Sequence, residues 1–102
     1  MEIKHYKVKF LNNVTEKDLP ALPVTIESRV NKAIQERLTV DPVNLGEPLY
    51  YSFKGFRRLR VGDYRVVYHV NTVKYEVNIV AIGHRDTIYE KALKIINKYI
   101  FQ

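Results

Sequence analysis

The segment of residues 56–70 constrains the fold more than any other part of the chain. Apolar and polar side chains alternate on both sides of Gly62-Asp63, which predicts two strands joined by a two-residue hairpin turn. If the strands pair directly across this turn, Arg60 lies opposite Arg65. One face of the hairpin then carries Phe56, Arg58, Arg60, Arg65, Val67 and His69. The other face is mostly apolar, should pack on a helix, and carries Arg57, Leu59, Val61, Tyr64, Val66 and Tyr68. A shift of one residue would bury the arginines, so the apolar pattern favours this register.

Three arginines, Arg58, Arg60 and Arg65, therefore converge on one face of the predicted hairpin. Like charges that face each other directly destabilise a sheet, so we expect an anion from outside the protein to bind them. Arginine suits planar, two-pronged contact with phosphate. The alternative is a solvated basic face that pairs with nearby glutamates.

The other elements follow from hydrophobic periodicity and from helix caps. The expected elements are a strand over residues 3–10, a short helix over 15–20, a long helix from 23 to 40, strands over 56–61, 64–70 and 75–82, and a final helix from 87. Residues 43–48 are expected to form a loop. Along the final helix, Lys91, Lys94 and Lys98 share a side that we expect to be solvated. The order β-α-α-β-β-β-α predicts a small α+β domain over residues 1–102, with an antiparallel-rich sheet, N-terminal helices and a C-terminal helix.

Composition excludes several classes of protein. The 102 residues suffice for one compact domain, and the absence of cysteine removes disulfides and thiol nucleophiles. The acidic residues and the three histidines show no metal-ligand spacing, so we expect neither a metal nor a cofactor. The net charge of +6 favours nucleic acid, an anionic membrane surface or an acidic protein as partner. No apolar run reaches the roughly 20 residues of a membrane span, and no signal peptide is visible, so we expect a cytoplasmic protein without a membrane partner.

A second group of functional candidates follows the last predicted strand. The chain can bend at Gly83, and His84, Arg85 and Tyr89 come next. We expect Arg85 and Tyr89 to lie near the arginine face. Neighbouring arginines favour the ionised form of a phenol, so Tyr89 is a candidate proton acceptor. The alternative for Tyr89 is a helix residue that packs on the sheet. Histidine titrates nearest neutrality, so His84 is an alternative acid or base, or a rim residue that contacts RNA.

These residues resemble the RelE/ParE toxin superfamily of bacterial toxin–antitoxin systems over almost the whole chain. The segments that carry the resemblance are Leu22-Pro23, Asp41-Pro42, Gly46–Leu49, Lys54–Tyr68, Ile82–Arg85 and Ile88–Glu90. The resemblance implies a RelE-like fold and a ribosome-associated, metal-independent endoribonuclease that cuts mRNA and inhibits translation. In the RelE branch, the 2′-hydroxyl attacks the adjacent phosphate and leaves a 2′,3′-cyclic phosphate and a free 5′-hydroxyl. The resemblance also implies a RelB-like antitoxin as partner.

The resemblance assigns roles residue by residue. Tyr89 would be the general base, Arg65 would stabilise the phosphorane, Arg85 would do the same or protonate the leaving oxygen, and Arg58 would help to hold the transition state. Where well-studied RelE members carry a lysine, this chain has Phe56, which we expect to stack on a base. The residues expected to bind RNA are Lys54, Phe56, Arg57 and Arg60.

Two alternative functions belong to other classes of protein. The first is a ParE-like toxin that inhibits DNA gyrase and cuts nothing. That branch generally lacks the set formed by Arg65, Arg85 and Tyr89, so their presence favours the nuclease. The second is a catalytically silent module that binds RNA or a protein partner, for which Phe56 in place of a basic residue is the main argument.

Overall fold

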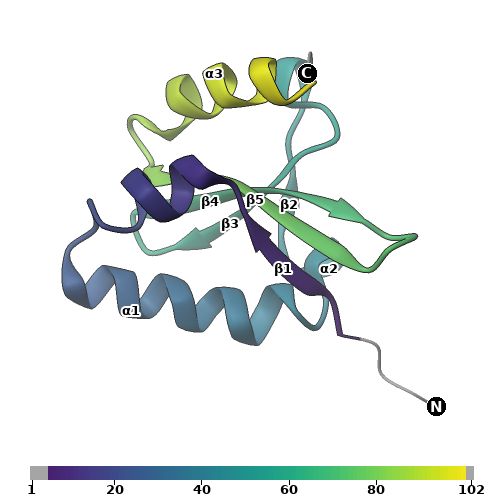
Figure 1. The fold of residues 1–102 in the computed structure, drawn as a ribbon, viewed down its shortest axis with the longest axis horizontal. Helices are drawn as coiled ribbons and strands as arrows, with labels where there is room; N and C mark the ends of the chain where they lie inside the picture. Colours follow the sequence, from purple (N-terminus) through teal and green to yellow (C-terminus); the bar gives the residue numbers. More distant parts are fainter. Residues whose placement is uncertain (1–4, 101–102) are drawn as a thin grey trace.

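A five-stranded sheet with helices on both faces forms the domain (Figure 1). The computed structural model describes residues 5–100, with side chains as far as Lys98. The strands are β1 (Lys7–Phe10), β2 (Glu47–Pro48), β3 (Arg57–Val61), β4 (Tyr64–Asn71) and β5 (Glu76–His84), in the order β1-β5-β4-β3-β2. β1 runs parallel to β5, and the other neighbours are antiparallel. The predicted α+β class is confirmed.

The β3–β4 hairpin has the predicted register. Val61 pairs with Tyr64, and Arg60 pairs with Arg65. Gly62 adopts a φ of 59° in the turn, a conformation that glycine reaches without the steric cost of a side chain. The arginine side chains of this hairpin therefore share the faces that the sequence predicted.

Helices cover the two faces of the sheet separately, with α1 below it and α3 above it in Figure 1. α1 (Val24–Ala33) follows Pro23 and continues into a wider turn, η2 (Ile34–Leu38). The hydrophobic cluster on the α1 side includes Val30, Ile34, Leu38, Leu59, Val66, Tyr68 and Ile82. α3 (Ile88–Ile100) buries Ile88, Ala92 and Ile96 in a second cluster with Phe56, Val67, Val80 and Ala81. Both helices therefore turn apolar side chains toward the sheet, as expected from their hydrophobic periodicity.

Residues 43–48, which we expected to form a loop, contribute regular structure. A short helix, α2 (Pro42–Leu45), begins at Asp41, whose carboxylate accepts a hydrogen bond from the Asn44 amide at 3.3 Å. β2 then pairs with Arg57 and Arg58 of β3 and forms one edge of the sheet. Both elements are too short to show a period in the sequence, which explains why the prediction of a loop was wrong.

The lysine side of α3 is not solvated throughout, because the half-buried Lys91 forms an ion pair with the buried carboxylate of Asp18. Its Nζ lies 2.5 Å from Oδ1 of Asp18 and donates to the Ile82 carbonyl at 2.8 Å. Asp18 belongs to the turn η1 (Val14–Asp18), is 4% exposed, and accepts the Ile82 amide at 2.9 Å. Three segments distant in sequence therefore meet at this carboxylate. Within residues 5–100, no helix has the length and apolarity needed to cross a bilayer.

Candidate functional site

Arg58 and Tyr89 form the centre of the candidate site, on the face of the sheet that α3 covers. Nη1 of Arg58, from β3, donates to the Tyr89 hydroxyl at 2.5 Å, and Tyr89 lies in the first turn of α3. Phe53, from the short turn η3 (Tyr51–Phe53), meets the Tyr89 ring edge-on with centroids 5.9 Å apart. The hydrogen bond to Tyr89 is the main cause that raises the pKa of Arg58, and the nearby Glu47 carboxylate adds to it. Arg58 therefore stays cationic beside the phenol.

Glu47 connects Arg58 with Arg60. Its two carboxylate oxygens lie 3.5 Å from Nη2 of Arg58 and 2.9 Å from Nε of Arg60. This carboxylate was not predicted as part of the site, because it lies on a strand of only two residues. The register that places Glu47 of β2 opposite Arg58 of β3 would have indicated this contact. That register can be predicted only if β2 is recognised as a strand. In the free protein, Glu47 thus offsets part of the charge that a phosphate would meet.

Arg65 and Arg85 are held at the hairpin turn. Nη1 of Arg65 donates to the carbonyls of Gly62 at 2.8 Å and Tyr64 at 2.9 Å. The Arg85 amide donates to the Asp63 carbonyl at 2.8 Å, and its guanidinium lies 3.7 Å from the Asp63 carboxylate. The expected arginine cluster therefore consists of two groups. Arg58 contacts Tyr89, whereas Arg65 and Arg85 lie at the hairpin turn. Arg60 lies between the two groups, because it pairs with Arg65 and shares Glu47 with Arg58.

His84 lies apart from this arginine face. It pairs with Tyr64 in the register of β4 and β5, and the two rings meet edge-on at 5.5 Å. Since paired residues point to the same face, His84 shares the face of Tyr64, which packs against the α1-side cluster. Its Nδ1 also accepts the Asp86 amide at 3.2 Å. These contacts position the end of β5, and they give no support to His84 as the acid or base.

Two of the four residues expected to bind RNA are engaged in the interior or on the opposite face. Phe56 is 4% exposed and lies in the α3-side cluster, so the expectation that it stacks on a base is wrong. Arg57 donates to the carbonyls of Val43 and Gly46 (2.9 Å to Gly46), because strand alternation turns it away from Arg58. Its role as an RNA contact stays a prediction, and these hydrogen bonds give it no support. Lys54 and Arg60 are exposed, and for them the prediction stands.

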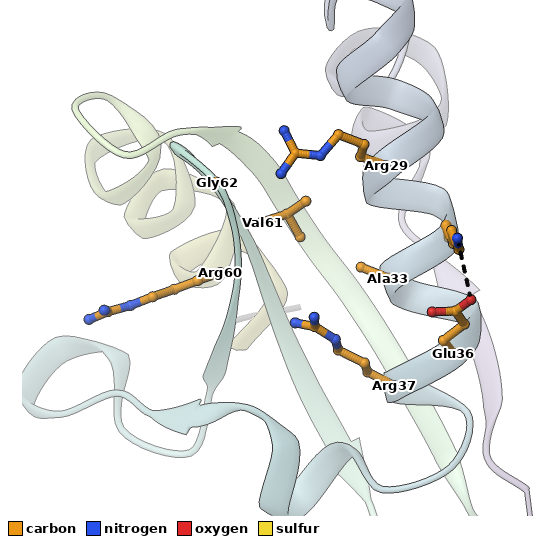
Figure 2. A pocket seen from close by; sticks show the side chains of 8 residues that line it. Arg29, Ala33, Glu36, Arg37, Arg60, Val61 and Gly62 are labelled. Atoms are coloured by element: carbon orange, nitrogen blue, oxygen red, sulfur yellow. Dashed lines mark ion pairs between the residues drawn. The ribbon is translucent and has the colours of Figure 1, made fainter.

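The other side of the hairpin carries a separate basic hollow, which Figure 2 shows. Arg29 of α1 and Arg37 of η2 extend toward β3, over a floor formed by Ala33 and Val61. The side chain of Arg60 points away from this hollow, although its neighbour Val61 points into it. Arg60 therefore belongs to the same face as Arg58. Among the described residues, no group of three or more histidines, aspartates or glutamates is placed to hold a metal ion.

Comparisons with known proteins identify the family of this chain. A family described as the ParE toxin of the type II toxin–antitoxin system parDE matches residues 10–89. Toxin RelE of Mycobacterium tuberculosis is 34% identical over 73 residues, which cover 72% of this chain and 75% of the relative. Toxin RelG of the same organism is 30% identical over 86 residues, covering 84% of this chain and 98% of the relative.

Solved structures show the same fold. The toxin–antitoxin complex RelBE2 of Mycobacterium tuberculosis matches with a TM-score of 0.75 and 28% identity, over 82% of this chain and 95% of the matched chain. The archaeal RelE–RelB complex from Pyrococcus horikoshii matches with a TM-score of 0.63 and 27% identity, over 79% and 96%. The chain belongs to the RelE/ParE superfamily of toxins from toxin–antitoxin systems.

Proposed function

We propose that this toxin is a RelE-type endoribonuclease that cleaves mRNA on the ribosome and thereby inhibits translation. The observation that carries the proposal is the hydrogen bond between Arg58 and the Tyr89 hydroxyl, on a face that also presents Arg60 and Arg65. The phenol oxygen is held beside a guanidinium, so it lies where a proton acceptor would meet the charge of a phosphodiester. A basic face beside this oxygen suits a phosphodiester, whose charge increases in the transition state.

The proposed reaction is an internal transesterification. Tyr89 Oη takes the proton of the ribose 2′-hydroxyl, and the 2′-oxygen forms a bond to the adjacent phosphorus. The bond from phosphorus to the 5′-oxygen breaks, and that oxygen receives a proton from Arg85 or from water. The products are a 2′,3′-cyclic phosphate and a 5′-hydroxyl. Arg58 and Arg65 offset the charge of the phosphorane, and no metal ion enters the reaction.

An antitoxin is the proposed regulator. Two of the similar structures, from Pyrococcus horikoshii and Methanococcus jannaschii, are complexes of RelE with RelB. The net charge of +6 favours an acidic partner that covers the basic face. We expect a RelB-like protein to bind this chain and to block access of mRNA to Tyr89.

Cleavage of mRNA on programmed ribosomes tests the proposal directly. Tyr89→Phe should lower the cleavage rate by about 10²–10⁴-fold, the usual contribution of a positioned general base. Tyr75→Phe removes a phenol hydroxyl on the β4–β5 hairpin and serves as the matched control. For Arg58→Ala, the control is Arg37→Ala, which removes an exposed arginine on the opposite face. End-group analysis should find a cyclic phosphate, and excess chelator should leave the rate unchanged.

The alternatives give different results in the same set of assays. A gyrase inhibitor would block supercoiling and leave mRNA intact on ribosomes and in solution. A silent module would bind RNA without cutting it. Folding and antitoxin binding of Tyr89→Phe and Arg58→Ala are checked first. If these folded variants arrest growth as strongly as the wild type does, the proposed chemistry is refuted.

A further inference from the structure

The loop between β2 and β3 presents two adjacent tyrosine rings to solvent. Tyr50 is 67% exposed, and Tyr51 is 96% exposed. Within the part of the chain that the structure describes, neither ring makes a hydrogen bond, an ion pair or a ring contact. Large aromatic side chains normally gain stability by burying apolar area, and these two gain little in the free protein.

Tyr51 also has an unfavourable backbone conformation. Its φ is 57°, in the left-handed region that bulky residues rarely adopt. Such a conformation is unfavourable for a tyrosine and is found at functional sites more often than elsewhere. Because the ring buries almost nothing, no packing within the described structure offsets this cost. The position is therefore better explained by a contact with a ligand than by folding.

The loop lies beside the candidate active site. Phe53, two residues after Tyr51 in the turn η3, contacts the ring of Tyr89. The two tyrosines and the exposed Lys54 border an open hollow of ≈ 690 Å³, whose other lining residues are Pro48, Leu49 and Gly55. An aromatic surface with a cation beside it thus adjoins the group that holds Tyr89.

We propose that Tyr50 and Tyr51 stack on unpaired bases of single-stranded RNA that flank the cleaved phosphodiester, while Lys54 contacts a neighbouring phosphate. The inference rests on the proposed function and deepens it, because it adds a site for RNA bases next to the site for the reacting phosphate. Aromatic rings beside a basic surface are the usual means by which proteins bind single strands without strong sequence preference. The bases of a duplex already stack on one another, so a duplex offers no free base face to these rings. Base stacking, which the sequence suggested for Phe56, is thus assigned to the two tyrosines.

A fluorescence titration tests the contact itself. The chain contains no tryptophan, so Tyr51→Trp introduces a single indole. In a Tyr89→Phe background, which prevents cleavage, an eight-nucleotide single-stranded RNA should quench its emission, and a duplex of the same sequence should not. Val73→Trp, at a position 88% exposed in the β4–β5 hairpin, is the control and should show no quenching. RNA that binds without quenching Trp at position 51, or a complete failure to bind RNA, would overturn the inference.

Affinity measurements separate stacking from charge. Loss of each ring to alanine should weaken RNA binding by roughly 5- to 150-fold, which corresponds to the usual 1–3 kcal/mol per stacked base. Tyr51→Phe keeps the ring face and should restore most of the lost affinity. The slope of log K against log salt should stay the same for both tyrosine variants. For Lys54→Gln, this slope should fall in magnitude by about 0.7, since one phosphate contact is lost.

The combined outcomes distinguish failure of the inference from failure of the proposed function. If the wild type cleaves mRNA and Tyr50→Ala/Tyr51→Ala cleaves it with unchanged KM, only the stacking inference is overturned. If no RNA is cleaved but single-stranded RNA still quenches Trp at position 51, the nuclease proposal fails and the stacking surface stands. If the double variant loses the antitoxin but keeps its RNA affinity, the loop is a protein-docking surface and the inference is wrong.

Discussion

Replacement of Lys91 by methionine should destabilise the toxin far more than an ordinary lysine substitution does. Lys91 Nζ is the cation nearest the Asp18 carboxylate, and the side chain of Asp18 is only 3% exposed. Methionine keeps the length of the side chain and removes its charge. The variant therefore leaves a buried carboxylate with one remaining hydrogen bond, from the Ile82 amide.

The expected cost follows from the burial of the two partners. Removing one member of a buried ion pair usually costs about 3–5 kcal/mol. Because the side chain of Lys91 is 39% exposed, water can partly replace it, and we expect the lower end, about 3 kcal/mol. A domain of this size unfolds at a cost of about 5–15 kcal/mol, so the loss is a large fraction of the total. At about 4–8 °C for each kcal/mol, Tm should fall by roughly 12–24 °C.

Urea denaturation of the wild type and four variants measures this effect. Lys94→Met, at an exposed position one turn along α3, is the control and should stay within about 0.5 kcal/mol of the wild type. Asp18→Asn keeps the acceptor for Ile82 and removes the charge. The double variant Asp18→Asn/Lys91→Met should then cost less than the sum of the single variants, by up to about 3 kcal/mol. A cost below about 1 kcal/mol for Lys91→Met, or additive single effects, would refute the assignment of a buried pair.

Three further predictions rest on other contacts. Gly46→Ala would place a methyl group 1.7 Å from the Tyr68 hydroxyl, so it should lower the free energy of unfolding by at least about 1–3 kcal/mol. The loss should be smaller in a Tyr68→Phe background, and urea denaturation of both variants measures the difference. Burial raises the pKa of Tyr68 above its usual value of 10.0, so the folded protein holds this proton more tightly than the unfolded chain does. Stability should therefore fall as the pH rises above about 10, and less steeply in Tyr68→Phe, as denaturation at pH 8–11 would measure. Glu47→Gln releases Arg58 and Arg60, and should strengthen RNA binding up to about fivefold in a fluorescence anisotropy titration.

Strand alternation explains why much of the fold was predictable. The Gly62-Asp63 turn fixed the pairing of Arg60 with Arg65, and the apolar residues fixed which face each side chain takes. Local sequence could not predict elements of only two to four residues, such as α2 and β2. Such elements form because distant segments hold them. The Tyr68 hydroxyl, for example, donates to the Pro42 carbonyl at 2.6 Å, 26 residues away along the chain.

The candidate site was predictable in its residue types but not in its contacts. The proximity of Tyr89 to Arg58 was expected because Tyr89 follows closely after the end of the last strand, but its hydrogen bond with Arg58 was not. The separation of His84 from that face followed from the register of β5, which the sequence left open. Phe56 was expected to stack on a base because it stands where well-studied RelE members carry a lysine, but α3 covers its ring. Arg57 was expected to contact RNA although the predicted register already placed it on the face opposite Arg58. In a strand, the next residue points to the opposite face.

The like charges on the arginine face do not require an external anion for folding, because the protein supplies its own counter-charges. Glu47 pairs with Arg58 and Arg60, and Asp63 lies near Arg85. The alternative expectation, a solvated basic face that pairs with nearby glutamates, therefore describes part of the free protein. Exposed pairs of this kind contribute only about 0–1 kcal/mol each, whereas charge-assisted hydrogen bonds to a phosphate are stronger. A bound phosphodiester can thus displace Glu47 at little cost, so the same pairing lets the basic face exist without RNA and leaves it available for RNA.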